Sequence, residues 1–231
     1  MRRTGLVALA AGLALSLVGS AALADFTPKF SLKTSNTKVK GNPSLDIHLE
    51  FDENDEEIGN FAMTIPKGFN IAADAAIENA GGPGSTGDEV IGGGTVTIEA
   101  GFACRPGPEG AIPASAPATI DATIYEKART DEEADAGVHA VWLLDLEPLN
   151  RVRLLITGNS KRGWKMEGAP TPSDNTCNPL IVDLKINDKS ESGVPLVTNA
   201  KKPGVYKFVA SVFSQDSPSV AKFTQKVKLT K

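Results

Sequence analysis

The sequence contains few of the residues that build catalytic and metal sites. It has only two histidines, His48 and His139, and two cysteines among 231 residues. A serine hydrolase needs a nucleophile, a histidine and an orienting carboxylate, yet Ser85 lies outside a G-x-S-x-G pattern because Pro83 replaces the first glycine. We therefore expect no catalytic residue, no cofactor and no bound metal, and predict that the chain is not an enzyme. An extracellular hydrolase of an unfamiliar type stays open as an alternative.

Aromatic residues are also scarce, at 6% of the chain. Sugar-binding β-sandwiches usually present several aromatic faces on which sugar rings stack. Here one tryptophan, Trp164, lies in a short basic stretch, Lys161–Lys165, that reads as an exposed turn. A carbohydrate-binding module that uses Trp164 as its ligand contact is therefore a second hypothesis. Trp142 lies in an apolar run and is predicted to be a core residue.

An excess of positive charge is absent as well. The formal net charge is −4, and a nucleic-acid partner would require a basic face. We therefore expect no nucleic-acid partner. Acidic residues gather in two runs, Asp52–Glu57 and Asp131–Asp135. Carboxylate oxygens are the ligands that calcium prefers, although neither run matches the spacing of an EF-hand loop, and solvated loop charge explains both runs equally well.

One long apolar run is present, and it lies at the N-terminus. Gly5–Val18 follows the basic pair Arg2–Arg3 and precedes Ala22–Leu23–Ala24, a small-residue cleavage pattern. These features are typical of a secretory signal peptide. We predict a signal peptide over residues 1–24 and a secreted or extracellular protein over 25–231, with association to the cell envelope left open. No later run is long and apolar enough to predict a transmembrane segment.

In an exported chain two cysteines are most simply paired. The sequence thus predicts one disulfide between Cys104 and Cys177, and two buried free thiols are the alternative. The chain-entropy model gives such a bond roughly 4 kcal/mol of stabilisation as an upper figure.

Apolar and polar residues alternate through most of residues 25–231. The clearest case is Ser44–Phe51, where the odd-numbered residues are apolar and the even-numbered residues are mainly polar. Alternation with period two predicts strands buried on one face, and about ten such strands are separated by turn residues. The expected fold is an all-β, antiparallel, immunoglobulin-like sandwich. A boundary near residues 110–118 would divide it into two packed sub-domains, and residues 70–80 are the one helix-like stretch.

Two further patterns have both functional and structural explanations. Gly82, Gly84 and Gly87 satisfy G-x-G-x-x-G, but a strand is expected to follow them, where a dinucleotide site requires a helix. His48 shares the polar face of its predicted strand with Asp46 and Glu50, which could form a weak metal or proton site. A flexible loop and a solvated strand face, respectively, account for the two patterns. His139 is expected to be a packed or edge histidine.

Several short motifs carry a resemblance to a known group of proteins. They are Gly41–Leu45, Ile65–Phe69 and the segment from Ile91–Gly92 through Val96–Ile98 to Cys104. Over residues 26–126 the chain resembles exported actinobacterial β-rich envelope or secreted proteins of unassigned activity. The last thirty or so residues are similar to the closing hairpin of bacterial immunoglobulin-like domains. The resemblance implies an envelope-associated or secreted β protein of unassigned activity, and it implies no catalytic residues. Our first hypothesis is therefore a non-enzymatic protein that acts by surface contact or adhesion. Its expected partner is a cell-envelope component, with a polysaccharide as one alternative, or an extracellular protein.

Overall fold

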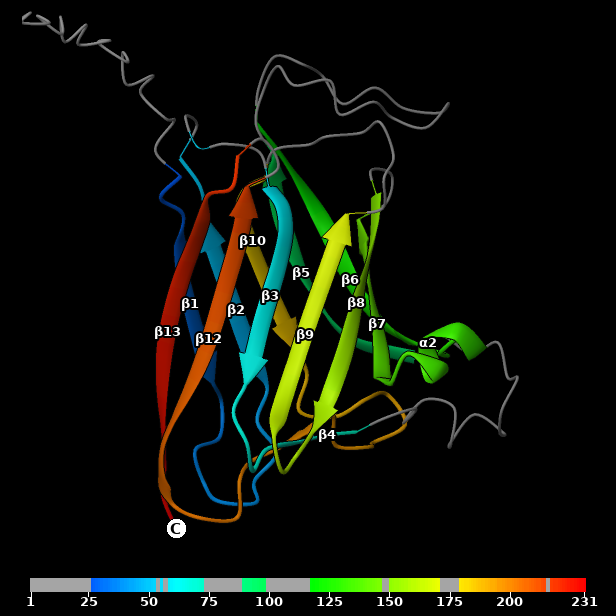
Figure 1. The fold of residues 1–231 in the computed structure, drawn as a ribbon, viewed down its shortest axis with the longest axis vertical. Coiled ribbons are helices and arrows are strands. Elements are labelled where there is room, and N and C mark those ends of the chain that lie inside the picture. Colours follow the sequence, from blue (N-terminus) through cyan, green and yellow to red (C-terminus); the bar gives the residue numbers. More distant parts are fainter. Residues whose placement is uncertain are drawn as a thin grey trace, which may run out of the picture.

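The computed structural model describes residues 26–52, 55, 58–72, 89–98, 117–146, 150–170, 179–214 and 217–231. Eleven strands form one antiparallel sheet that curls into a nearly closed, barrel-like body (Figure 1). In spatial order they are β1 (Lys29–Thr34), β2 (Leu45–Glu50), β10 (Pro179–Ile186), β5 (Glu89–Ile98), β6 (Ala118–Lys127), β7 (Val138–Leu146), β8 (Asn150–Asn159), β9 (Gly163–Pro170), β3 (Ile58–Ile65), β12 (Gly204–Ser214) and β13 (Val220–Leu229). Two short strands, β4 (Asn70–Ile71) and β11 (Val197–Thr198), form a separate pair.

The two edge strands, β1 and β13, run in the same direction (Figure 1). This direction follows from the strand count, because eleven strands that alternate in direction leave the first and the last parallel. The edges meet at one end through a parallel bridge between Lys38 and Thr230. There the Val39 amide donates to the Thr230 carbonyl at 2.9 Å, and the Thr230 amide donates to the Thr37 carbonyl at 2.8 Å.

The alternation of apolar and polar residues along the strands places the apolar side chains inside the curled sheet, as the sequence predicts. In β2, Leu45, Ile47 and Leu49 are buried, while the residues between them face outwards. The largest fully buried side chains are Trp142, Phe69 and Phe208. Phe69 contacts Phe208 edge to face, with ring centroids 5.2 Å apart. The predictions of a core position for Trp142 and of a closing hairpin, β12–β13, are confirmed.

The glycine triplet Gly92–Gly94 lies within β5. A side chain at Gly92 would collide with the Lys185 carbonyl oxygen, and one at Gly94 with that of Asp183. Both oxygens belong to the neighbouring strand β10. Glycine is required because the two backbones approach closely at these positions.

Two other segments differ from expectation or lie partly outside the described residues. Asn70 and Ile71, at the start of the predicted helix-like stretch, form β4, and the rest of that stretch from residue 73 is outside the described part. The acidic run Asp131–Asp135 is a helical turn, α2, where a loop was expected. Thr130 and Glu133 close a capping box at its start, which satisfies backbone donors that would otherwise lack partners.

The predicted disulfide and the G-x-G-x-x-G glycines fall on residues outside the described ranges, as does most of the predicted boundary at 110–118. In the described part of the chain, no helix is long and apolar enough to cross a membrane.

Candidate binding surface

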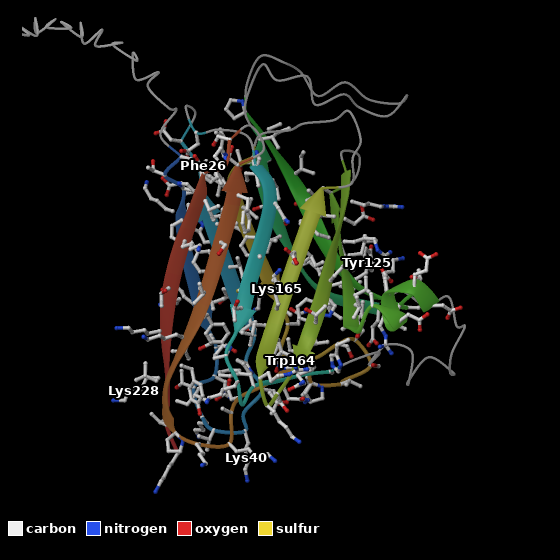
Figure 2. The ribbon with its side chains drawn as sticks, viewed as in Figure 1. Phe26, Lys40, Tyr125, Trp164, Lys165 and Lys228 are labelled. Atoms are coloured by element: carbon white, nitrogen blue, oxygen red, sulfur yellow. The ribbon has the colours of Figure 1, made fainter. Side chains whose placement is uncertain are left out.

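Trp164 is buried, and its predicted exposure is wrong. Its side chain is 3% exposed, and its Nε1 group donates a hydrogen bond of 2.9 Å to the backbone carbonyl of Phe69. The turn that precedes β9 ends at Arg162, so that Trp164 is already a strand residue on the inner face. Figure 2 shows Trp164 within the lower part of the body. Its ring is therefore unavailable as an exposed platform for a sugar.

His139 packs against Trp164, as expected of a packed histidine. The ring centroids lie 4.4 Å apart, and His139 Nε2 is 2.9 Å from the Ile71 carbonyl oxygen. This cluster connects β7, β9 and the β4 segment inside the body. We interpret it as structural.

His48 lies on the outer face of β2, where the sequence placed it. Its Nδ1 atom is 2.6 Å from Asp183 Oδ1 on β10, and its Nε2 atom is 4.0 Å from Glu50 Oε2. Asp183 is the partner that the sequence did not reveal, because β2 and β10 are far apart along the chain. Among the described residues, no group of three or more histidine, cysteine, aspartate or glutamate side chains could hold a metal ion.

Two carboxylates face each other across β5 and β6, namely Glu89 and Glu126. Glu126 is 1% exposed, and Glu89 accepts a hydrogen bond from the Ser192 amide. Burial alone would raise the pKa of Glu89, but hydrogen bonds from Ser192 and Ser190 outweigh it and lower the pKa below its ordinary value. Glu89 is thus held as a carboxylate, and Glu126 is closed off from a polymeric substrate, so this pair does not support glycoside hydrolysis.

The acidic runs are used structurally where they are described. Glu133 accepts a hydrogen bond from the Thr130 amide at 2.8 Å and pairs with Arg153 at 2.6 Å. Burial would raise the pKa of Glu133, but these contacts outweigh it and lower the pKa. In the other run, Asp55 accepts hydrogen bonds from the Thr27 and Asp52 amides at 2.7 and 2.8 Å. Residues 53, 54, 56 and 57 lie outside the described part, and with them the alternative that this run binds calcium.

The outer face of β1, β2 and β10 carries charges of both signs that neutralise one another. Lys29 pairs with Glu50 at 2.6 Å, next to the pair of His48 and Asp183. This mixed surface is typical of a solvated sheet face, and nothing in it favours a ligand of either charge.

The outer face of β3, β12 and β13 differs, because every charged residue within these strands is a lysine. We call this set the wall lysines: Lys207, Lys222, Lys226 and Lys228. All four are exposed. Lys207 and Lys226 lie directly opposite each other in the β12–β13 register. No ion pair involves any of the four in the described part of the chain.

A second group of lysines lies at the end of the body where β1 and β13 are bridged. We call these the end lysines: Lys38, Lys40, Lys201, Lys202 and Lys231. Backbone hydrogen bonds gather the segments that carry them, since the Lys40 amide donates to the Ala200 carbonyl at 3.2 Å and Val39 bonds to Thr230. Figure 2 shows Lys228 on the β12–β13 side and Lys40 at the adjoining end. The two groups therefore lie on adjoining parts of the body, and we refer to them together as the lysine surface.

The net charge of the whole chain does not reveal this surface, because acidic residues elsewhere outnumber its lysines. From Asn199 onwards the chain holds seven of its 24 basic residues but only one of its 28 acidic residues. The available signal was that Lys222, Lys226 and Lys228 are separated by even numbers of residues along a predicted strand. Residues two or four apart in a strand share a face.

Fold and surface together define an antiparallel all-β protein with a segregated lysine surface. No protein-family model matches the chain, and no curated protein matches it.

Proposed function

We propose that the protein is an exported, non-enzymatic β protein that acts by surface contact, binding an anionic component of the cell envelope through its lysine surface. The observation that carries the proposal is the set of wall lysines, which lie exposed on β12 and β13 without an acidic residue in those strands. Exposed charges of one sign attract an oppositely charged partner and orient its approach. The N-terminal features that predict export place such a partner outside the cell.

The arrangement of Lys207 and Lys226 supports a binding role. Like charges directly opposite on neighbouring strands are destabilising. On β1 and β2, by contrast, the same sheet pairs opposite charges, as with Lys29 and Glu50. An anionic ligand that contacts both Lys207 and Lys226 would relieve the repulsion between them.

The finer description of the fold, an immunoglobulin-like body with a Cys104–Cys177 disulfide, belongs to this proposal. The register of β5 and β10 supports the disulfide, because Ile98 pairs with Pro179. Cys104 follows Ile98 by six residues and Cys177 precedes Pro179 by two, so both cysteines are within chain reach of the same point on the sheet. Non-reducing peptide mass spectrometry should detect one linked peptide, and alkylation of both cysteines in the native protein would exclude it.

Retention of the purified protein on the producing cell's isolated envelope tests the proposal. We expect retention at low salt and release as salt is raised, because exposed charges are screened. Neutralising the wall lysines by Lys207→Gln and Lys226→Gln together should abolish most of the retention. A matched double variant, Lys165→Gln and Lys185→Gln, removes the same charge from β9 and β10 and should leave it intact. Equal retention of both variants would refute the proposed surface.

A further inference from the structure

We infer that the ligand of the lysine surface is a linear anionic polysaccharide, which lies along β13 and continues around the bridged end of the body. This inference deepens the proposed function and rests on it. It specifies the shape and the chemistry of the partner, which the presence of a basic surface alone leaves open.

The wall lysines form a line rather than a disc. Three of them, Lys222, Lys226 and Lys228, lie on one face of β13. Strand geometry places Lys226 and Lys228 about 6.7 Å apart and extends the line from Lys222 to Lys228 over about 20 Å. Lys207 lies beside the middle of this line, opposite Lys226. A polymer with regularly spaced anionic groups can contact all four.

The line continues onto the end lysines. Beyond Leu229 the chain reaches Lys231, while Thr230 is bonded to the segment that carries Lys38 and Lys40. Lys202 is held nearby, since the Tyr206 hydroxyl donates to its backbone carbonyl at 2.8 Å. Lys228 lies on the side of the body and Lys40 at its end (Figure 2). A flat bilayer contacts one of them at a time, whereas a flexible chain follows both.

The composition of the surface favours a polysaccharide over a nucleic acid. Proteins that bind single-stranded nucleic acids use exposed aromatic rings on which bases stack. On β12 and β13 no aromatic side chain is fully exposed, and Phe208 is completely buried. All nine basic side chains are lysines, which act as point charges and lack the planar fork with which arginine recognises phosphates and bases.

Defined polymers test the inference by equilibrium binding to the purified protein. We expect binding to polygalacturonate and to heparin, two linear anionic polysaccharides, and none to dextran, which is neutral. Affinity for galacturonate oligomers should rise with chain length until the oligomer spans the line of wall lysines. Vesicles of phosphatidylglycerol and phosphatidylcholine and a double-stranded DNA fragment serve as the membrane and nucleic-acid comparisons, and both should bind more weakly.

The decisive variant is Lys226→Glu, which places a carboxylate opposite Lys207. It should weaken polysaccharide binding at least tenfold, while the thermal midpoint stays unchanged or rises because a repulsive pair becomes an attractive one. Lys185→Glu makes the same change of charge on β10 and should weaken binding by less than twofold.

The failures of the two proposals are distinguishable. Envelope retention that depends on the wall lysines, together with no binding to either polysaccharide, would overturn the inference and leave surface contact standing. Absence of envelope retention would overturn surface contact itself. Tighter binding to the vesicles or to DNA, an affinity independent of oligomer length, or equal effects of Lys226→Glu and Lys185→Glu would also overturn the inference.

Discussion

Phe30 of β1 packs against Phe223 of β13, with ring centroids 5.7 Å apart and ring planes tilted by 33°. The pair joins the two edges of the sheet, which otherwise share backbone hydrogen bonds only near Thr230 in the described part. We predict that Phe223→Ala lowers the free energy of unfolding by about 2 kcal/mol, less than for a fully buried phenylalanine because both rings are half-buried. Urea unfolding measures the change. The control is Val220→Ala, at a β13 side chain that is 39% exposed, which should change the free energy of unfolding by less than about 0.5 kcal/mol. An equal loss in both variants would argue that the Phe30–Phe223 contact does not hold the two edge strands together.

The two tryptophans offer a matched comparison of a satisfied and an unsatisfied indole. Trp164 Nε1 donates to the Phe69 carbonyl, whereas Trp142 Nε1 is buried without a hydrogen-bond partner. Replacing either by phenylalanine removes a similar volume, but only Trp164→Phe also breaks a hydrogen bond. We predict that Trp164→Phe costs about 1–2 kcal/mol more than Trp142→Phe. Chemical denaturation of the two variants measures the difference, and a larger loss at Trp142 would contradict it.

Gly94 should tolerate no side chain. The Cβ atom of an alanine there would meet the Asp183 carbonyl oxygen on β10, and backbone cannot move aside as the end of a side chain can. We predict that Gly94→Ala lowers the free energy of unfolding by about 3 kcal/mol or more. Gly137→Ala is the control, because Gly137 has a φ of 78° but nothing within 4 Å of the added atom, and should cost about 1 kcal/mol. Unfolding curves and soluble yield compare them, and equal stability would exclude the collision.

Glu133 should make stability depend on pH in the acid range. Its folded-state pKa lies below the ordinary value of 4.5, so its contribution is present above that value and is lost as pH falls through the folded-state pKa. We predict that Glu133→Gln lowers the free energy of unfolding by about 1 kcal/mol at neutral pH, the worth of a helix cap. The difference from the native protein should shrink as pH falls below 4.5 and disappear once pH is below the folded-state pKa of Glu133.

Glu132→Gln provides the control for Glu133→Gln, since Glu132 is exposed in the same helical turn. Urea unfolding over the acid range should show a parallel pH profile for this variant and the native protein. A pH-dependent difference as large as that of Glu133→Gln would assign the effect to net charge instead of the cap.

Strand faces could be predicted from the sequence, but strand neighbours could not. The alternation in β2 correctly places Leu45 and Ile47 inside and His48 outside. The same pattern does not reveal that His48 lies opposite Asp183, because register between distant strands depends on the whole sheet. Trp164 was misplaced for a local reason: its basic neighbours suggested a turn, yet strand alternation begins at Gly163 and directs the tryptophan inwards.

Charge was predictable as a total but not as a pattern in space. A net charge of −4 led to the expectation of no nucleic-acid partner and gave no sign of a basic surface. Pairing of β12 with β13 then placed Lys207 beside Lys226, and the bridge at Thr230 brought Lys38 to the end of β13. The first juxtaposition depends on the register of a hairpin and the second on a contact across most of the chain, and composition encodes neither.

The parallel edges have a consequence for the folding of the chain. Hairpins such as β12–β13 join residues close in sequence and can form early. The contacts between the two edges of the sheet instead join Phe30 to Phe223 and Lys38 to Thr230, across nearly the whole described chain. Closing so large a loop carries a high entropy cost that is offset only after the intervening strands are in place. We therefore expect sealing of the body to be its last and slowest folding event, so that until then both edges expose unpaired backbone groups on which other chains could assemble.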